Sequence, residues 1–118
     1  MAFTEFEDSI AWQKAQHLME TILVHIEPLK AYWLKDQTYR AGTSISNNIA
    51  EGFERQYDKE FIQFLFYSLR SCGEVRSMLH LAIRLKYLSE NTALELIEKA
   101  REISRIIRGL IKYLKTNK

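Results

Sequence analysis

Six polar residues have the types and spacing that chemistry at a helix surface would need. They are Arg40, Ser44, Asn48, Glu51, Ser71 and Glu74. The first four follow one another at steps of four, four and three residues, so in a helix their side chains lie one above another on one face. A serine beside a base could act as a nucleophile, and two converging carboxylates could act as general acid and general base.

A structural network is the simpler interpretation of these residues. Ser44 has no obvious base nearby in the sequence, since the three histidines lie elsewhere. Glu51 and Glu74 could converge, but Arg40 would then be a counter-ion that keeps the carboxylates ionised. Ser and Asn are weaker helix formers than Lys and Glu, so this stripe predicts partners in another helix or chain. We therefore expect a polar network that fixes helix register or a subunit interface, and no enzyme.

Metal and cofactor sites are not expected. His17 and His25 are two turns apart, and His80 falls on another predicted helix. One cysteine with dispersed histidines does not make a zinc site, and no Glu-x-x-His pair recurs as a di-iron bundle requires. Cys72 lies on an apolar stripe, which indicates a small core residue rather than a reactive thiol.

Basic residues are concentrated in the second half of the chain. Residues 1–60 hold six Lys/Arg and ten Asp/Glu, whereas residues 61–118 hold eleven and five. Bases near a helix C-terminus oppose the helix dipole favourably. We favour that interpretation, because the pI of 8.7 is lower than in strongly basic nucleic-acid-binding domains. The alternative is a phosphate-binding face. Its candidate contacts are Arg76, Arg84, Arg101, Arg105, Arg108, Lys112 and Lys115.

Length and composition predict one domain that is soluble and cytoplasmic. The 118 residues, of which 47% are hydrophobic and 27% charged, can bury a hydrophobic core without a stabilising disulfide or metal ion. The single cysteine fits a reducing compartment. Residues 1–8 are acidic and lack the apolar run of a signal peptide. No window holds the roughly 20 apolar residues of a membrane span, so no membrane partner is expected.

Apolar periodicity, one proline and four glycines divide the chain into four helices. The predicted ranges are residues 9–26, 34–51, 58–88 and 91–114. The first ends before Pro28, since the residue preceding a proline avoids the helical region. Gly52 suits a left-handed end of the second helix, Asp58 an N-cap of the third, and Ser89 or Asn91 an N-cap of the fourth.

Apolar residues at steps of three or four mark the predicted core. They are Ala11, Ala15, Leu18, Ile22 and Ile26 in the first helix, Phe61, Leu65, Ser68, Cys72, Val75, Leu79 and Ala82 in the third, and Leu94, Ile97, Ala100, Ile103, Ile107, Leu110 and Leu114 in the fourth. No alternating β-strand pattern occurs. Short connections make helices antiparallel neighbours, so we predict an all-α, up-down-up-down four-helix bundle.

Aromatic residues exceed what one bundle core requires. Phe61 and Phe64 are predicted in the core, whereas Phe53, Phe66 and Tyr67 fall on other faces. A bundle buries one broad stripe per helix, so the surplus indicates a second buried face and self-association. Tyr32 and Trp33 are candidates for the same interface.

The sequence resembles the bacterial four helix bundle protein family, also called 23S rRNA-intervening-sequence proteins. The residues that carry the resemblance are Trp12-Gln13-Lys14-Ala15, Gln37, Arg40-Ala41, Ser44-Ile45, Asn48-Ile49-Ala50-Glu51-Gly52, Glu60-Phe61, Phe64-Leu65, Ser71, Glu74 and Arg84-Leu85-Lys86-Tyr87-Leu88. They span residues 6 to about 114. The chain departs from the family at Ser46, where Pro is frequent, and at Arg70, where Gly is frequent.

The resemblance implies a four-helix bundle that assembles into a pentameric, barrel-like ring without known enzymatic activity. Many members are encoded within intervening sequences of large ribosomal RNA genes. The family shares its fold with the accessory variability determinant proteins of retroelements, which bind nucleic acid and a reverse transcriptase but carry a different signature.

Three functional hypotheses follow. The first is a non-enzymatic, homo-oligomeric bundle, pentameric by the resemblance, that associates with RNA or DNA through its basic residues. In a ring, five weak basic faces would act together. The second is a protein-interaction scaffold that binds no nucleic acid. The third is an enzyme that uses Arg40, Ser44, Glu51 and Glu74.

Overall fold

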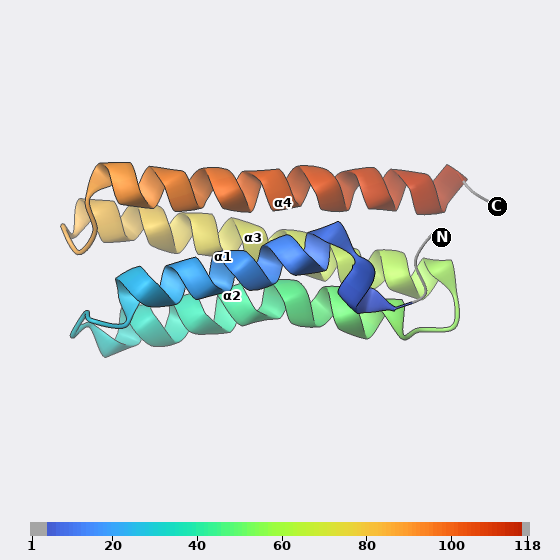
Figure 1. The fold of residues 1–118 in the computed structure, drawn as a ribbon, viewed down its shortest axis with the longest axis horizontal. Coiled ribbons are helices and arrows are strands. Elements are labelled where there is room, and N and C mark those ends of the chain that lie inside the picture. Colours follow the sequence, from blue (N-terminus) through green and yellow to red (C-terminus); the bar gives the residue numbers. More distant parts are fainter. Residues whose placement is uncertain (1–4, 117–118) are drawn as a thin grey trace.

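The computed structural model describes residues 5–116, and it confirms the predicted all-α bundle (Figure 1). The elements are a short 3-10 helix, η1 (Phe6–Asp8), and the helices α1 (Ile10–Ile26), α2 (Tyr32–Phe53), α3 (Asp58–Arg84) and α4 (Glu90–Thr116). Residues 1–4 of the predicted acidic N-terminus, and Lys118, lie outside the described residues.

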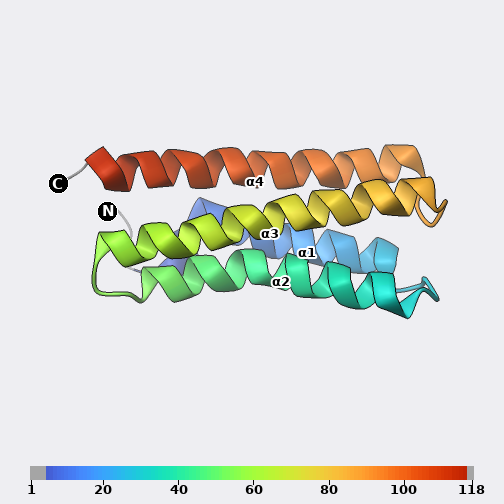
Figure 2. The same ribbon diagram turned by 180° about the vertical axis from the view of Figure 1, so that it is seen from behind.

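The four helices form a square in which each helix packs against two neighbours. α1 contacts α2 and α4, and α3 contacts α2 and α4, whereas the described residues make no contact across the diagonal between α1 and α3. Figure 2 shows the long helices running antiparallel to their chain neighbours. The molecule is a rod of 48 × 20 × 19 Å. None of the described helices combines the length and apolarity that crossing a membrane requires.

The core confirms most of the predicted apolar positions. All five predicted residues of α1 and all seven of α3 are buried, as are Ile97, Ala100, Ile103, Ile107 and Leu114 of α4. The prediction was wrong at Leu94, which is 44% exposed, and Leu110 is only partly buried. Phe64 is also only partly buried, and the Arg55 guanidinium covers its ring at 4.6 Å from the centroid.

The predicted end of α2 at Gly52 was wrong. α2 begins two residues earlier and ends two residues later than expected, and no described glycine has a positive φ. Gly52 instead lies at a close contact between α2 and α3. A Cβ at this position would lie 2.7 Å from Phe64 Cβ and 2.9 Å from Phe61 Cδ1. The glycine is therefore required by packing rather than by backbone conformation.

The two ends of α3 also differ from the prediction. Asp58 is the first helical residue, and Tyr57 takes the N-cap position without a side-chain cap. Asp58 still favours the helix start, because its carboxylate lies near the positive end of the dipole. α3 ends at Arg84, four residues early, since Lys86 turns into the left-handed region at φ 63°. The Tyr87 amide then donates to the Ala82 carbonyl and closes the helix end.

The predicted N-cap at Ser89 is confirmed. Its Oγ accepts a hydrogen bond of 3.2 Å from the Thr92 amide, which satisfies one of the free donors at the start of α4. The connection between α1 and α2 occupies residues 27–31. Tyr32 and Trp33, which precede the predicted start of the second helix at residue 34, form the first turn of α2.

Candidate functional site

Three of the six predicted polar-site residues meet between α2 and α3. Asn48 Nδ2 donates to Ser44 Oγ at 2.8 Å, and Ser71 Oγ lies 3.0 Å from Ser44 Oγ. The Asn48 amide also donates to the Ser44 carbonyl. About one turn before Ser71 on α3, the buried Ser68 Oγ donates to the carbonyl of Ile45 at 2.7 Å. Because these side chains are small, the two helices can approach closely. Their polar groups then form hydrogen bonds with one another inside the contact.

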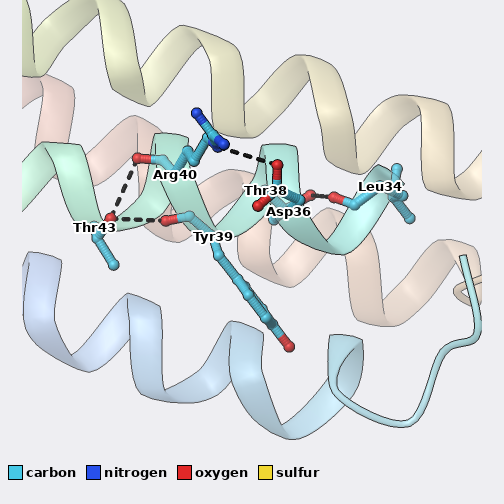
Figure 3. Close-up of polar contacts among 6 residues, drawn as sticks. All are labelled: Leu34, Asp36, Thr38, Tyr39, Arg40 and Thr43. Carbon is cyan, nitrogen blue, oxygen red and sulfur yellow. Dashed lines mark hydrogen bonds and ion pairs between the residues drawn. The ribbon is translucent and has the colours of Figure 1, made fainter. Parts of the chain in front are cut away.

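The three charged members of the set lie outside this contact. Arg40 pairs with Asp36 one turn away on α2, at 3.0 Å, with both side chains exposed (Figure 3). Glu51 pairs with Arg55, again one turn away. Glu74 is exposed and forms no ion pair with any residue in the range 5–116. The predicted charge pair of Arg40 with the glutamates is therefore absent. Arg40 and Glu51 each pair with a residue one turn away on their own helix, and Glu74 pairs with no described residue.

The chemistry available around Ser44 is limited to hydrogen bonding. In the described part of the chain, its hydroxyl contacts the Asn48 amide and the Ser71 hydroxyl, and neither group is a base. The arrangement resembles a structural network that fixes the register of α2 against α3. That the protein is not an enzyme stays a prediction.

The predicted basic residues gather on one face formed by α3 and α4. Arg101, Arg105, Arg108, Lys112 and Lys115 follow at steps of four, three, four and three residues, which places them on one side of α4. This side borders α3, since Lys115 Nζ lies 5.6 Å from the centre of the Phe66 ring. Arg76 joins from α3, since its charge and that of Arg108 both act on the Cys72 thiol, and Arg84 is exposed at the last residue of α3. We call these seven residues the basic face.

Most of the basic face has no acidic partner. Glu98 pairs with Arg105 at 2.9 Å and with Arg101 at 3.9 Å, and the Arg105 hydrogen bond holds the pKa of this carboxylate below its ordinary value. Arg76, Arg84, Arg108 and Lys112 form no ion pair with any residue that the structure describes. The Nε of Arg76 is buried and has no hydrogen-bond partner among the described residues. Unpaired guanidinium groups are the form of this side chain that anions bind.

Cys72 lies beneath the basic face. The thiol is fully buried, and burial raises its pKa above the ordinary value of 9.0, although a hydrogen bond with Ser104 and the charges of Arg76 and Arg108 act in the opposite direction. Its predicted role as a core residue is confirmed.

We expect Cys72 to be unreactive in the folded protein. A buried thiol held protonated presents little thiolate, so a disulfide reagent at pH 8 should label it at least about a hundredfold more slowly than in urea, through opening of the structure. Absorbance of the released thiolate measures the rate. Equal rates in the folded and the unfolded protein would contradict the burial of Cys72.

Metal binding has no support in the described residues. Among residues 5–116, no group of three His, Cys, Asp or Glu side chains could hold a metal ion. His17 and His25 line a shallow surface hollow with Glu20, Thr21 and Val24, and His80 is exposed on α3.

One feature was missed in the sequence, and another was predicted only at Tyr32 and Trp33. Tyr39, which points toward α1 in Figure 3, donates to Glu27 Oε2 at 2.7 Å, and burial together with this bond raises the pKa of Tyr39 to about 12. The other is a set of exposed apolar side chains at the end of the rod that holds the α1–α2 and α3–α4 connections (Figure 1). We call it the apolar end. Its members are Leu23, Val24, Tyr32, Trp33, Leu85 and Tyr87.

Comparison with known proteins identifies the family. The sequence model described as 23S rRNA-intervening sequence protein matches residues 7–109, which is most of the chain. The chain belongs to this family. No curated protein matches it.

A solved member of the S23 ribosomal protein family has a similar fold. This protein of unknown function from Bacteroides thetaiotaomicron shares 26% sequence identity, with a TM-score of 0.77. The match covers 87% of the present chain and 99% of that one. In this chain the segment from Asn48 to Gly52 supplies Asn48 to the polar network and Gly52 to the close contact of α2 with α3.

Proposed function

We propose that this member of the 23S rRNA-intervening sequence family is a non-enzymatic, cytoplasmic homo-oligomer that binds RNA through its basic face. The observation that carries the proposal is the difference in charge pairing between the two halves of the bundle. In residues 5–60, four of the six Lys/Arg side chains form ion pairs. In residues 61–116, only two of ten do.

Unpaired bases in a row suit a polyanion. Arg101 and Lys115 are 14 residues apart, so at ~1.5 Å per residue the α4 part of the basic face is roughly 21 Å long. A nucleic-acid strand that covers it would place several phosphates beside bases without acidic partners and release their counterions. The family description names an RNA context, which favours RNA over DNA.

Self-association would strengthen this binding. The apolar end exposes Tyr32 at 77% and Trp33 at 51%, and such patches mark interaction surfaces. Phe53 no longer supports this argument, since it packs against Phe61 with 5.9 Å between ring centres. The resemblance described above implies a pentamer. Five basic faces on one assembly would bind one long RNA with a strength that a single face lacks.

Neutralising two residues of the basic face should weaken RNA binding and reduce its salt dependence. For Arg108→Gln/Lys112→Gln we expect binding of a labelled single-stranded oligonucleotide to weaken about 10-fold or more at low salt. The slope of log K against log salt should fall by about 1.4, or ~0.7 for each lost phosphate contact. Fluorescence anisotropy over a salt series measures both.

A matched control loses the same charge elsewhere. Lys30→Gln/Arg40→Gln removes one base in the α1–α2 connection and one on α2, a helix that does not pack against α4. This variant should keep the wild-type slope to within about 0.5. Equal losses in both double variants would show that net charge, not the basic face, drives binding, and would overturn the assignment.

A protein-interaction scaffold is the second candidate, and the apolar end is the observation that favours it. It predicts that a tagged protein retains a protein partner and no RNA. The variant Tyr32→Ser/Trp33→Ser should then lose that partner, whereas Arg108→Gln/Lys112→Gln should keep it.

A further inference from the structure

Arg76 is the residue of the basic face that has a buried side-chain donor without a hydrogen-bond partner among the described residues. That donor is the Nε of Arg76. Its Nη2 lies 3.9 Å from the position that a Cβ on Gly73 would take, so part of the guanidinium lies against bare backbone. An unsatisfied donor of this kind is costly, and a ligand that draws the guanidinium into hydrogen bonds would remove that cost.

No described carboxylate forms an ion pair with Arg76 or Arg108. Arg76 follows Cys72 by one turn of α3, and its Nη2 reaches back toward Gly73. Arg108 follows the buried Ser104 by one turn of α4, and the charges of both arginines act on the Cys72 thiol. Both guanidinium groups therefore lie on the side of the bundle that covers Cys72. Like charges there repel each other, and an anion between them would remove that repulsion.

Acidic side chains border the basic face on its far side. Glu95, Glu98 and Glu102 line a surface hollow of about 380 Å³ together with Lys99 and Arg105. An anion is repelled from that border and attracted toward α3, where the described residues put no carboxylate on Arg76 or Arg108. The electrostatic preference therefore points to Arg76 and Arg108 as the place where an anion binds most tightly.

We propose that Arg76, together with Arg108, forms a clamp for one phosphodiester of a bound RNA strand. This inference rests on the proposed function and adds to it a single site of directional hydrogen bonds within the basic face. A phosphodiester presents two unesterified oxygens, which match the fork of a guanidinium. The remaining bases then follow the strand as point charges along α4.

A carboxylate from a second copy of the chain is the competing ligand. The linear row of bases favours the phosphodiester, because a strand of RNA engages Arg108, Lys112 and Lys115 in succession, whereas one carboxylate satisfies Arg76 alone. The two ligands predict different effects of the same substitution.

The decisive variant keeps the positive charge at position 76 and removes the paired N–H donors of the guanidinium. Arg76→Lys should weaken binding of a labelled oligouridylate about 10-fold, with a salt slope equal to that of the wild type, since no charge is lost. Arg105→Lys is the matched control. Arg105 is exposed and already bonded to Glu98, so this change should alter affinity less than about twofold.

A second measurement observes the Arg76 Nε–H without RNA. In ¹H–¹⁵N spectra, the Nε–H signal of Arg76 is identified by its disappearance in Arg76→Lys. Titration of the full-length protein with dimethyl phosphate should shift this signal more than the other arginine Nε–H signals.

The outcomes separate the two proposals. If wild-type binding is salt-dependent but Arg76→Lys binds RNA as tightly as the wild type, the clamp is overturned and the basic face stands. If RNA does not bind but dimethyl phosphate shifts the Arg76 signal, Arg76 remains a phosphodiester site, and the proposed function fails together with RNA as the source of that phosphodiester. If the Arg76 signal does not move, the clamp is overturned. A lowered oligomeric mass of Arg76→Lys in light scattering, without such a shift, would assign Arg76 to a carboxylate of a second copy.

Discussion

Gly52→Val should destabilise the bundle by about 3 kcal/mol, because it overpacks a close contact between α2 and α3. The new Cβ would lie 2.7 Å from Phe64 Cβ, 2.9 Å from Phe61 Cδ1 and 3.3 Å from the Phe61 carbonyl oxygen. Two of these atoms belong to the backbone or sit directly on it, so α3 itself must move. Urea unfolding followed by circular dichroism measures the loss.

Gly109→Val is the matched control for this steric effect. Gly109 also lies inside a helix, but a Cβ there would meet nothing within 4 Å. Because Val and Gly differ little in helix propensity, we expect a change within about 0.5 kcal/mol. If Gly52→Val were as mild as Gly109→Val, α2 and α3 would not approach at Gly52, and the motif that ends in this glycine would need another explanation.

Ile97→Ala should cost about 2–5 kcal/mol of unfolding free energy, through lost burial and the cavity that remains. Ile97 is fully buried between the helices. Leu94, one turn earlier, has the same apolar spacing in the sequence but is 44% exposed. Leu94→Ala should therefore cost less than about 1 kcal/mol.

Comparable losses for the two variants would contradict the orientation of the first turn of α4. The measurement should be made at two protein concentrations, because the stability of an oligomer depends on concentration. A cost at Leu94 that grows on concentration would instead place this side chain in a subunit contact.

The sequence predicts the bundle well because its helices are long and strongly periodic. The seam from Phe61 to Ala82 is buried at each expected step, since three-and-four spacing keeps one stripe toward the core over the whole length of a helix. Leu94 fails because the buried stripe in the first turns of α4 passes through Ala93 and Leu96, and Leu94 lies ~100° around the helix from Ala93. Spacing alone does not reveal how many neighbours a residue has.

Helix ends and charge partners were the least predictable features. Gly52 looks like a helix terminator in sequence, yet its role depends on the approach of Phe61 and Phe64 from α3. Arg40 was predicted opposite Glu51 and Glu74, but Asp36 at the i−4 position competes successfully. The basic face could be predicted from composition, whereas the lack of acidic partners around Arg76 and Arg108 requires the three-dimensional arrangement.

Light scattering coupled to size exclusion, at low and high salt and with absorbance at 260 and 280 nm, tests the assembly and the RNA-binding face together. We expect a particle of about 70 kDa, five times the 14.0 kDa chain. It should carry nucleic acid at low salt and lose it at high salt. A particle of 14.0 kDa with the absorbance of protein alone at both salt concentrations would contradict both the assembly and the RNA-binding face.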